Sequence, residues 1–286
     1  MLSERLIVRP MRRAEFDTLI RWASNEGWNP GRYDADIFWN TDPEGFIAAE
    51  LDGELIGGGS IVAYQQQFGF MGFFIIKPEY RGQGLGTKLW LTRRDTLLAR
   101  LSPSAAIGMD GVFEMQPFYT KGGFKFSHRD IRFEGVAQAN VIPSSLTLLS
   151  KVPFDLIVKY DTQHFPAERA SFLKAWINQP ESRALSLVEN GVLRGYGVIR
   201  RCHNGFKIGP LFADSAAIAL DLFNGLSDHA AGQSIFIDVP EVNQAAMKMV
   251  SDKDMQEVFG CARMYYGPQP TLDDDTIFGV TTFELG

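Results

Sequence analysis

The spacing of apolar residues divides the first half of the chain into strands and helices. The Asp52-Gly53 pair stands between two β-rich runs and predicts the turn of a hairpin. Four apolar residues recur at the spacing of one helical face and predict a helix at about residues 14–26: Phe16, Leu19, Ile20 and Ala23. Read in order, the pattern predicts a strand at residues 6–10, that helix, a short helix at about 34–40, and strands at 45–51, 54–64 and 68–77.

An apolar run, Phe73-Phe74-Ile75-Ile76, leads into a glycine-rich turn and then into a helical pattern. The run is too short to cross a membrane and is rich in β-forming residues, so we expect a buried strand. Glycines at 82, 84 and 86 let the backbone adopt conformations closed to other residues and let another molecule come close. The free N–H groups of the first helical turn face that molecule, and the helix dipole favours a negative charge. We interpret the stretch as a cradle for a pyrophosphate group.

The spacing within the turn decides which phosphate-binding loop is expected. A Walker loop requires Gly-Lys-Ser/Thr, and Gly86-Thr87-Lys88 inverts the last two residues; a dinucleotide fold requires Gly-x-Gly-x-x-Gly, whereas the glycines here alternate. Arg81, Gly84 and Gly86 do match Arg/Gln-x-x-Gly-x-Gly/Ala. That pattern resembles the acyl-CoA loop of the GNAT superfamily of N-acyltransferases, and the order of elements around it resembles the GNAT fold. The alternative is a plain glycine turn, which the strand before it and the helix after it disfavour.

The resemblance continues through the rest of the first half. Residues 105–109 read as a strand, Phe118–Phe124 look like the family's Phe/Leu-Tyr-x-x-x-Gly-Phe segment, and residues 124–133 read as a closing strand or two. A turn-rich stretch follows, with Pro143-Ser144-Ser145. We therefore place the first domain at residues 1–145 and the second at 146–286.

The second half repeats the first faintly. Residues 190–199 echo the hairpin at 52–61, and Asn243 begins a segment similar to the family's Asn-x-x-Ala. Lys207–Asp214 stand where the glycine loop belongs, before a helix at about 215–227, but they lack Arg-x-x-Gly-x-Gly. The resemblance implies an α/β fold with a mixed sheet: a GNAT acyltransferase fold followed by a second, degenerate GNAT-like domain, as in bacterial two-domain members whose first half is active. The alternative for the second half is a β-hairpin domain of coincidental likeness.

Composition narrows the class of protein. The chain has 286 residues, is 45% hydrophobic and carries a net charge of −6 with no clustered basic residues, so we expect a real core and no nucleic-acid partner. Cys202 and Cys261 lie far apart, which argues against a disulfide framework and fits a reducing compartment. No run reaches membrane-spanning length, and no targeting segment is visible. The expectation is a cytoplasmic, soluble protein with no membrane partner. The four histidines are scattered and no spacing matches a metal site, so no metal cofactor is expected.

The resemblance implies direct transfer of an acyl group from an acyl-CoA, most simply acetyl-CoA as co-substrate, to an amine. By analogy with the family, the strand backbone at Phe74, Ile75 and Ile76 binds the pantetheine arm, and an N–H near Ile75 stabilises the negative oxygen of the tetrahedral intermediate. Tyr119 matches the family's tyrosine and is the candidate general acid for the departing thiolate. The pyrophosphate loop that the resemblance implies comprises Arg81, Gly82, Gln83, Gly84, Leu85, Gly86 and Thr87.

The acceptor side is less defined. The amine must lose a proton, directly or through water, and Asp110 and Glu114 are candidate bases that carry no motif. Glu26, Trp28 and Asp34 lie where the family's substrate-side helices run, and a Trp with acids suits a cationic amine, although Trp28 could equally staple two helices. A small-molecule or peptide amine is expected, whether protein N-terminus, polyamine, amino sugar or amino acid. The sequence does not decide whether the protein forms a homodimer. The alternative function is a catalytically silent acyl-CoA-binding sensor or interaction module.

Overall fold

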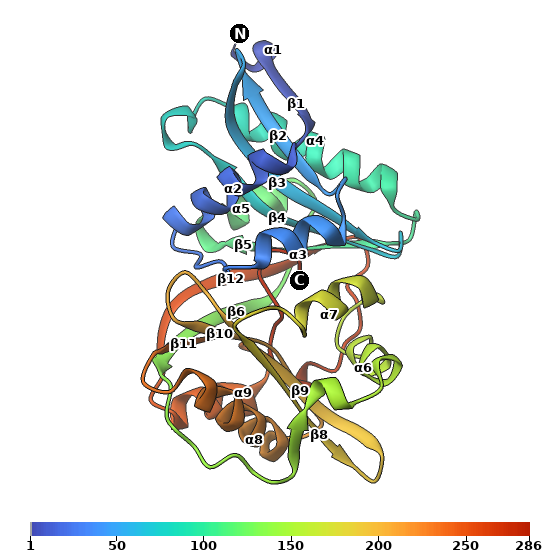
Figure 1. The fold of residues 1–286 in the computed structure, drawn as a ribbon. Coiled ribbons are helices and arrows are strands. Elements are labelled where there is room, and N and C mark those ends of the chain that lie inside the picture. The colour runs from blue at the N-terminus through green and yellow to red at the C-terminus, as the bar shows by residue number, and fades with distance from the viewer. Residues whose placement is uncertain (1) are drawn as a thin grey trace.

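The computed structural model describes residues 2–286 and shows two halves joined by one sheet (Figure 1). In the first half the helices and strands are α1 (Leu2–Arg5), β1 (Leu6–Pro10), α2 (Arg13–Asn25), α3 (Asp34–Thr41), β2 (Phe46–Leu51), β3 (Glu54–Tyr64), β4 (Phe68–Ile76), α4 (Leu85–Arg100), β5 (Ala106–Val112), α5 (Gln116–Lys121) and β6 (Lys125–Val136). The predicted hairpin, glycine turn and flanking helices are therefore confirmed to within about two residues of most predicted ends.

The second half has the same alternation of hairpin, strand and helix. Its elements are β7 (Leu146–Leu148), α6 (Phe154–Asp161), α7 (Ala170–Trp176), β8 (Ser182–Glu189), β9 (Val192–Arg201), β10 (Phe206–Ala213), α8 (Ala216–Ser227), β11 (Ser234–Pro240), α9 (Gln244–Asp252), β12 (Gln256–Tyr266) and β13 (Ile277–Gly279). The fold class is thus the expected mixed α/β arrangement, with two similar halves in tandem.

The two halves exchange a strand. The sheet runs β1-β2-β3-β4-β5-β12-β6-β11-β10-β9-β8-β7, so β12 from the end of the chain lies between β5 and β6 of the first half (Figure 1). Cys261 pairs with Val112 on one side and with Asp130 on the other. The predicted domain boundary near residue 145 lies between β6 and β7. It stays a prediction, because β12, which follows the boundary, pairs with β5 and β6, which precede it.

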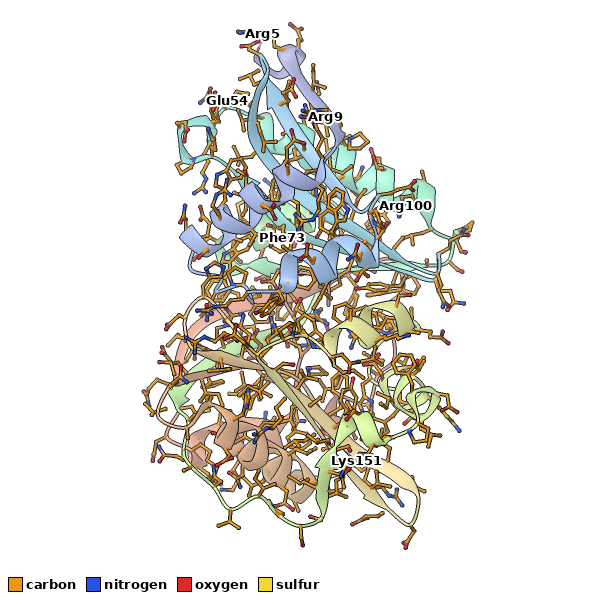
Figure 2. The ribbon with its side chains drawn as sticks, viewed as in Figure 1. Arg5, Arg9, Glu54, Phe73, Arg100 and Lys151 are labelled. Atoms are coloured by element: carbon orange, nitrogen blue, oxygen red, sulfur yellow. The ribbon has the colours of Figure 1, made fainter. Side chains whose placement is uncertain are left out.

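Helices cover both faces of this sheet. Phe73, labelled in Figure 2, packs in a shared core against Phe16 of α2 and Phe38 of α3, with ring centroids 5.7 and 5.9 Å apart. Phe38 in turn stacks on Trp176 of α7, so this core continues from one half into the other. On the opposite faces, α4 and α5 cover the first half and α8 and α9 the second. Within residues 2–286 no helix is long and apolar enough to span a membrane.

The strands β10 and β11 of the second half diverge, and β13 fills the space between them. They pair in parallel from Phe206 to Ile208, after which β13 inserts beside β10. Asn243 holds the segment before and within β13, because its Nδ2 donates to the carbonyl oxygens of Asp274, Asp275 and Ile277 at 3.0–3.1 Å. The second half therefore has a strand where an open wedge between diverging strands would otherwise lie.

One sequence interpretation of this region is wrong. Lys207–Asp214 were expected to replace the glycine loop, but residues 206–213 form β10, buried along its whole length. The connection to α8 is reduced to Asp214 and Ser215, and the Ser215 side chain caps the helix by accepting from the Ile218 N–H. The Gly209-Pro210 pair is typical of a turn and suggested a loop at this point. It lies instead within a strand whose other residues are mostly apolar, as is usual for a fully buried strand.

Candidate functional site

A cavity of about 360 Å³ opens where β4 and β5 of the first half separate. The two strands pair in parallel from Phe68–Ala106 to Met71–Met109, and no further pairs join them although both strands continue. The lining is mostly apolar and comes from both halves: Glu26, Trp28, Met71, Gly72, Phe73, Phe74, Ile75, Ile76, Arg81, Gly82, Gly86, Met109, Asp110, Val112, Met115, Tyr119, Phe259, Cys261, Phe283 and Glu284. Unlike the wedge in the second half, this one has room for a ligand.

A bulge in β4 shapes the middle of the cavity. Gly72 pairs with Ser60 and Ile75 with Gly58, so three steps along β4 oppose two along β3, and Phe73 adopts a left-handed φ of 52°. Such a conformation costs energy for a bulky residue and is typical of functional sites. Arg93 of α4 supports the bulge, since its Nη2 donates to the carbonyl oxygens of Ser60 and Gly72, both at 2.6 Å. The bulge packs Phe73 against the core, and both Phe73 and Phe74 line the cavity.

The glycine turn leaves β4 at the end of this cavity. Gly82 and Gly84 have left-handed φ values of 75° and 78°, and α4 starts directly after Gly84, at Leu85. The first N–H groups of α4 lack partners within the helix and are available to an anion. Of the predicted loop residues, Arg81, Gly82 and Gly86 line the cavity itself. The others are outside the lining but belong to the same turn: Gln83, Gly84, Leu85 and Thr87.

Arg81 fastens the turn to its surroundings. Its Nε donates to the Ile76 carbonyl oxygen at 2.8 Å, and its Nη2 pairs with the Glu26 carboxylate just beyond the end of α2. This ion pair is partly exposed, so its contribution to stability is small. Its geometric effect is to connect the glycine turn to α2 across the cavity.

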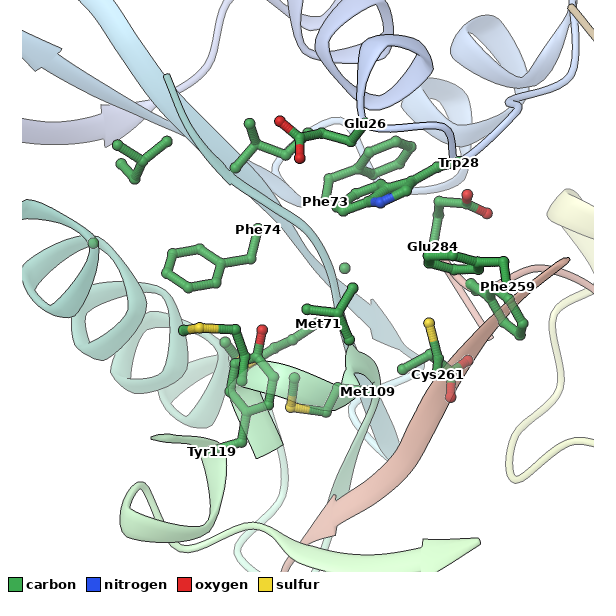
Figure 3. A pocket seen from close by; sticks show the side chains of 18 of the residues that line it. Glu26, Trp28, Met71, Phe73, Phe74, Met109, Tyr119, Phe259, Cys261 and Glu284 are labelled. Atoms are coloured by element: carbon green, nitrogen blue, oxygen red, sulfur yellow. The ribbon is translucent and has the colours of Figure 1, made fainter. Parts of the chain in front are cut away.

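Tyr119 of α5 lies in the cavity wall opposite Phe73 and Trp28. The residue is 3% exposed, and its ring packs over Gly111 of β5 and beside Trp90, with ring centroids 6.2 Å apart. In Figure 3 its hydroxyl points into the cavity, toward the Phe74 ring. Burial raises the pKa of Tyr119 above its usual value of 10, so the phenol is protonated at neutral pH.

Asp110 of β5 also lines the cavity, but Arg263 of β12 holds its carboxylate in two hydrogen bonds of 2.5 and 2.8 Å. Asp130 shares the same guanidinium at 3.4 Å. Burial raises the pKa of Asp110, with Asp130 adding to the rise and Arg263 opposing it. The carboxyl group is therefore fixed in the wall between β5 and the exchanged strand.

The remaining predicted residues separate into two groups. Glu26 and Trp28 are in the cavity wall, and the Trp28 carbonyl accepts from Arg132 of β6 at 2.7 Å and from Lys207 of the second half at 3.4 Å. Glu114 is exposed and Asp34 is fully buried under Arg200, with contacts of 3.0 and 3.1 Å; neither lines the cavity. Within residues 2–286 no group of three His, Cys, Asp or Glu residues is placed to hold a metal ion.

Sequence reasoning missed the wall that the second half contributes. Phe259 and Cys261 reach the cavity from β12, and Phe283 and Glu284 reach it from the segment after β13 (Figure 3). Burial raises the pKa of the Cys261 thiol well above 9, so it is a poor nucleophile. No local motif marks these residues, because the strand exchange that positions them is a long-range property of the sheet.

Comparison with known proteins agrees with this geometry. A family model described as "Acetyltransferase (GNAT) family" matches residues 13–124, and a second, "Acetyltransferase (GNAT) domain", matches residues 157–279. The chain is 27% identical to holothin acyltransferase of Pseudoalteromonas sp., over 97% of this chain and 94% of that protein. It is 23% identical to an uncharacterized N-acetyltransferase of Bacillus subtilis, over 76% of each chain.

The fold has a solved counterpart. The crystal structure of a putative acetyltransferase from Pyrococcus horikoshii superposes with a TM-score of 0.85 at 22% identity, covering 99% of this chain and 96% of the other. At that identity the likeness shows the fold alone. Together with the two matched domains and the acyltransferase relatives, it settles the classification: the chain belongs to the GNAT family of acetyltransferases and carries two GNAT domains in tandem.

Proposed function

We propose that the protein transfers an acetyl group from acetyl-CoA to a primary amine by direct attack within a ternary complex. The observation that carries the proposal is that the glycine turn, the β4 bulge and Tyr119 border one cavity between diverging strands. The GNAT family supports acyl transfer by this chain, and acetyl-CoA is the co-substrate of GNAT acetyltransferases.

The cavity suggests how acetyl-CoA lies. Backbone N–H groups of Arg81–Thr87 and the start of α4 would hold the pyrophosphate, and the wedge beside Phe74, Ile75 and Ile76 would hold the pantetheine arm. The guanidinium of Arg81 is already bonded to Ile76 and Glu26. We therefore assign Arg81 the role of fixing the loop's shape, with the backbone as the main pyrophosphate ligand.

The reaction then requires three proton movements. The acceptor ammonium first loses a proton to a base or to water; the free amine attacks the thioester carbon, the C–N bond forms, and collapse of the intermediate breaks the C–S bond and leaves its electron pair on sulfur. The nitrogen loses its second proton to a base or to water, and the Tyr119 hydroxyl gives its proton to the thiolate and is protonated again from solvent. Asp110 is the candidate base that lines the cavity, although Arg263 occupies its carboxylate; Glu114 would have to act through solvent.

Thiol release tests the proposal. We expect purified protein to release CoA thiol from acetyl-CoA faster when a panel of primary amines is present than when it is absent. The panel contains 2-phenylethylamine, spermidine, glucosamine and an unblocked peptide. CoA binding measured by calorimetry without amine-dependent thiol release would favour the silent acyl-CoA sensor instead.

The second half is proposed not to bind CoA. Its wedge holds β13, where a side chain added at Gly279 would already contact Ile237 at 3.0 Å, and its strand-to-helix connection lacks the alternate glycines. Titration of the full chain with CoA should therefore give one site per chain. Two sites of similar affinity would contradict the assignment of a degenerate second half.

A further inference from the structure

The segment after β13 carries the chain from the second half back into the first. Residues 281–286 are buried, and the C label of Figure 1 lies between the two halves. The Leu285 carbonyl accepts from the Tyr64 hydroxyl at 2.9 Å, and the Glu284 carbonyl accepts from the Ser60 hydroxyl at 3.3 Å. A side chain at Gly72 would stand 2.1 Å from the Glu284 carbonyl oxygen, so the segment crosses β4 directly at the bulge. The backbone of Glu284 is thus fixed beside the acetyl-transfer cavity.

The side chain of Glu284 is a buried carboxylate without a full set of partners. The residue is 3% exposed and lines the cavity. Within residues 2–286 no hydrogen-bond donor reaches its buried Oε2 atom. Leaving a buried charged oxygen unbonded costs free energy, so an unsatisfied carboxylate at a cavity wall calls for an explanation such as a role in binding or catalysis.

Basic residues surround this carboxylate without bonding to Oε2. Arg132, Arg200 and Lys207 are buried and interact electrostatically with Glu284. Arg132 is bound to Asp238 and Arg200 to Asp34, while the Lys207 amine donates to the Trp28 carbonyl at 3.4 Å. Three positive and three negative charges therefore balance in this cluster, and Glu284 is the acid of the cluster that lines the cavity.

Aromatic faces border the same side of the cavity. Figure 3 shows the Glu284 carboxylate beside the Trp28 indole, on the side away from Tyr119. Phe259 and Phe283 lie next to it with ring centroids 6.1 Å apart, and Phe73 is 6.5 Å from Trp28. Such faces favour flat apolar groups, and the Arg132 guanidinium already lies over the Phe259 and Phe283 rings, 5.5 and 5.0 Å from their centroids.

We propose that Glu284 binds the ammonium group of the acceptor, and that the acceptor is a primary amine carried on an aromatic body. This inference rests on the proposed function and adds its substrate class. The ammonium would donate to the Glu284 carboxylate where that residue lines the cavity, the aromatic body would lie against Trp28, Phe259 and Phe283, and the thioester would approach from the side of Tyr119 and the glycine turn.

The test compares amines in wild-type protein and in Glu284→Gln. In the wild type we expect 2-phenylethylamine to give a higher kcat/KM than spermidine or glucosamine. In Glu284→Gln we expect the KM for 2-phenylethylamine to rise about 10-fold to 100-fold, as loss of a hydrogen bond to a charged group implies. CoA affinity should stay unchanged. An unchanged KM, or a preference for the aliphatic amines, would overturn the inference.

A second variant separates acceptor binding from charge balance. Lys207→Met combined with Glu284→Gln removes one charge of each sign, so the cluster stays neutral. If Glu284 merely balances its basic neighbours, the double variant should recover the wild-type KM and melting temperature. Binding of the ammonium by Glu284 predicts that the raised KM persists in the double variant, and recovery would therefore refute it.

The same data distinguish this inference from the function on which it rests. If no amine of the panel accelerates thiol release by the wild-type protein, the proposed function itself fails. If the wild type acetylates an amine and Glu284→Gln does so with unchanged KM, acetyl transfer stands and the role of Glu284 is rejected.

Discussion

Replacing Tyr119 with Phe is expected to lower kcat by about 10-fold to 10³-fold, somewhat less than the full effect of general acid catalysis because water can partly replace the donor. The ring packs over Gly111 and beside Trp90, and Phe preserves both contacts. Only the hydroxyl that points into the cavity is removed. The raised pKa keeps this hydroxyl protonated at neutral pH, so it carries the proton that the thiolate takes up. Steady-state kinetics on any amine accepted in the thiol-release assay measure the effect.

The matched control is Tyr266→Phe. Tyr266 belongs to the same aromatic group through Phe124, with ring centroids 5.7 Å apart, but it does not line the cavity. Its variant should keep the wild-type kcat, and both variants should keep the wild-type CoA affinity and melting temperature. If Tyr119→Phe stays within about twofold of wild type while chemistry limits the rate, the proton must come from water or another residue.

The fold of the first half could be predicted because its signals are local. Asp52-Gly53 specifies a tight turn, and its glycine has a φ of 85° in the structure. The glycine turn after Ile76 is likewise read from adjacent residues, since Gly82 and Gly84 both adopt left-handed conformations that side chains disfavour. These features require no knowledge of what the segment packs against.

The shared wall of the site could not be predicted in this way. Strand β12 has the composition of an ordinary buried strand, and its pairing with β5 joins Cys261 to Val112, which are far apart in the chain. Asp34 shows the same limit, because its place where the family's substrate-side helices run suggested an acceptor-binding residue, whereas its carboxylate is bound by Arg200 of β9. Pairings of this kind depend on the whole sheet, and one sequence carries no spacing that reveals them.

The burial of the segment after β13 was equally hidden. Thr281, Thr282 and Glu284 are polar residues, yet all three are at most 3% exposed. Residues from other parts of the chain accommodate this segment. Gly72 leaves room for the Glu284 backbone. Arg169 donates to the Thr281 hydroxyl at 2.8 Å and to the Gly286 carbonyl at 3.0 Å. The residue we propose to bind the acceptor therefore lies in the part of the chain whose role was least visible in the sequence.

Replacing Gly86 with Val is expected to weaken CoA binding by about 100-fold or more while leaving the fold intact. Gly86 is in the first turn of α4, where its backbone is helical and does not require glycine. A Cβ atom there would meet Phe74 at 3.5 Å and Ile76 at 3.7 Å, which are ordinary contacts, so the branched side chain would extend into the space assigned to the cofactor. Losing two hydrogen bonds to the pyrophosphate, at about 1.5–3 kcal/mol each, accounts for the expected change.

Calorimetry with CoA is the measurement, and Ala99→Val is the matched control. Ala99 is an exposed residue near the other end of α4, so its variant adds the same branching to the same helix without approaching the cavity. Gly84→Val should also weaken CoA binding, but the φ of 78° at Gly84 means that strain in the turn contributes, so it is the less specific probe. If Gly86→Val folds and binds CoA with wild-type affinity, the glycine turn is not the pyrophosphate cradle and the position proposed for acetyl-CoA is wrong.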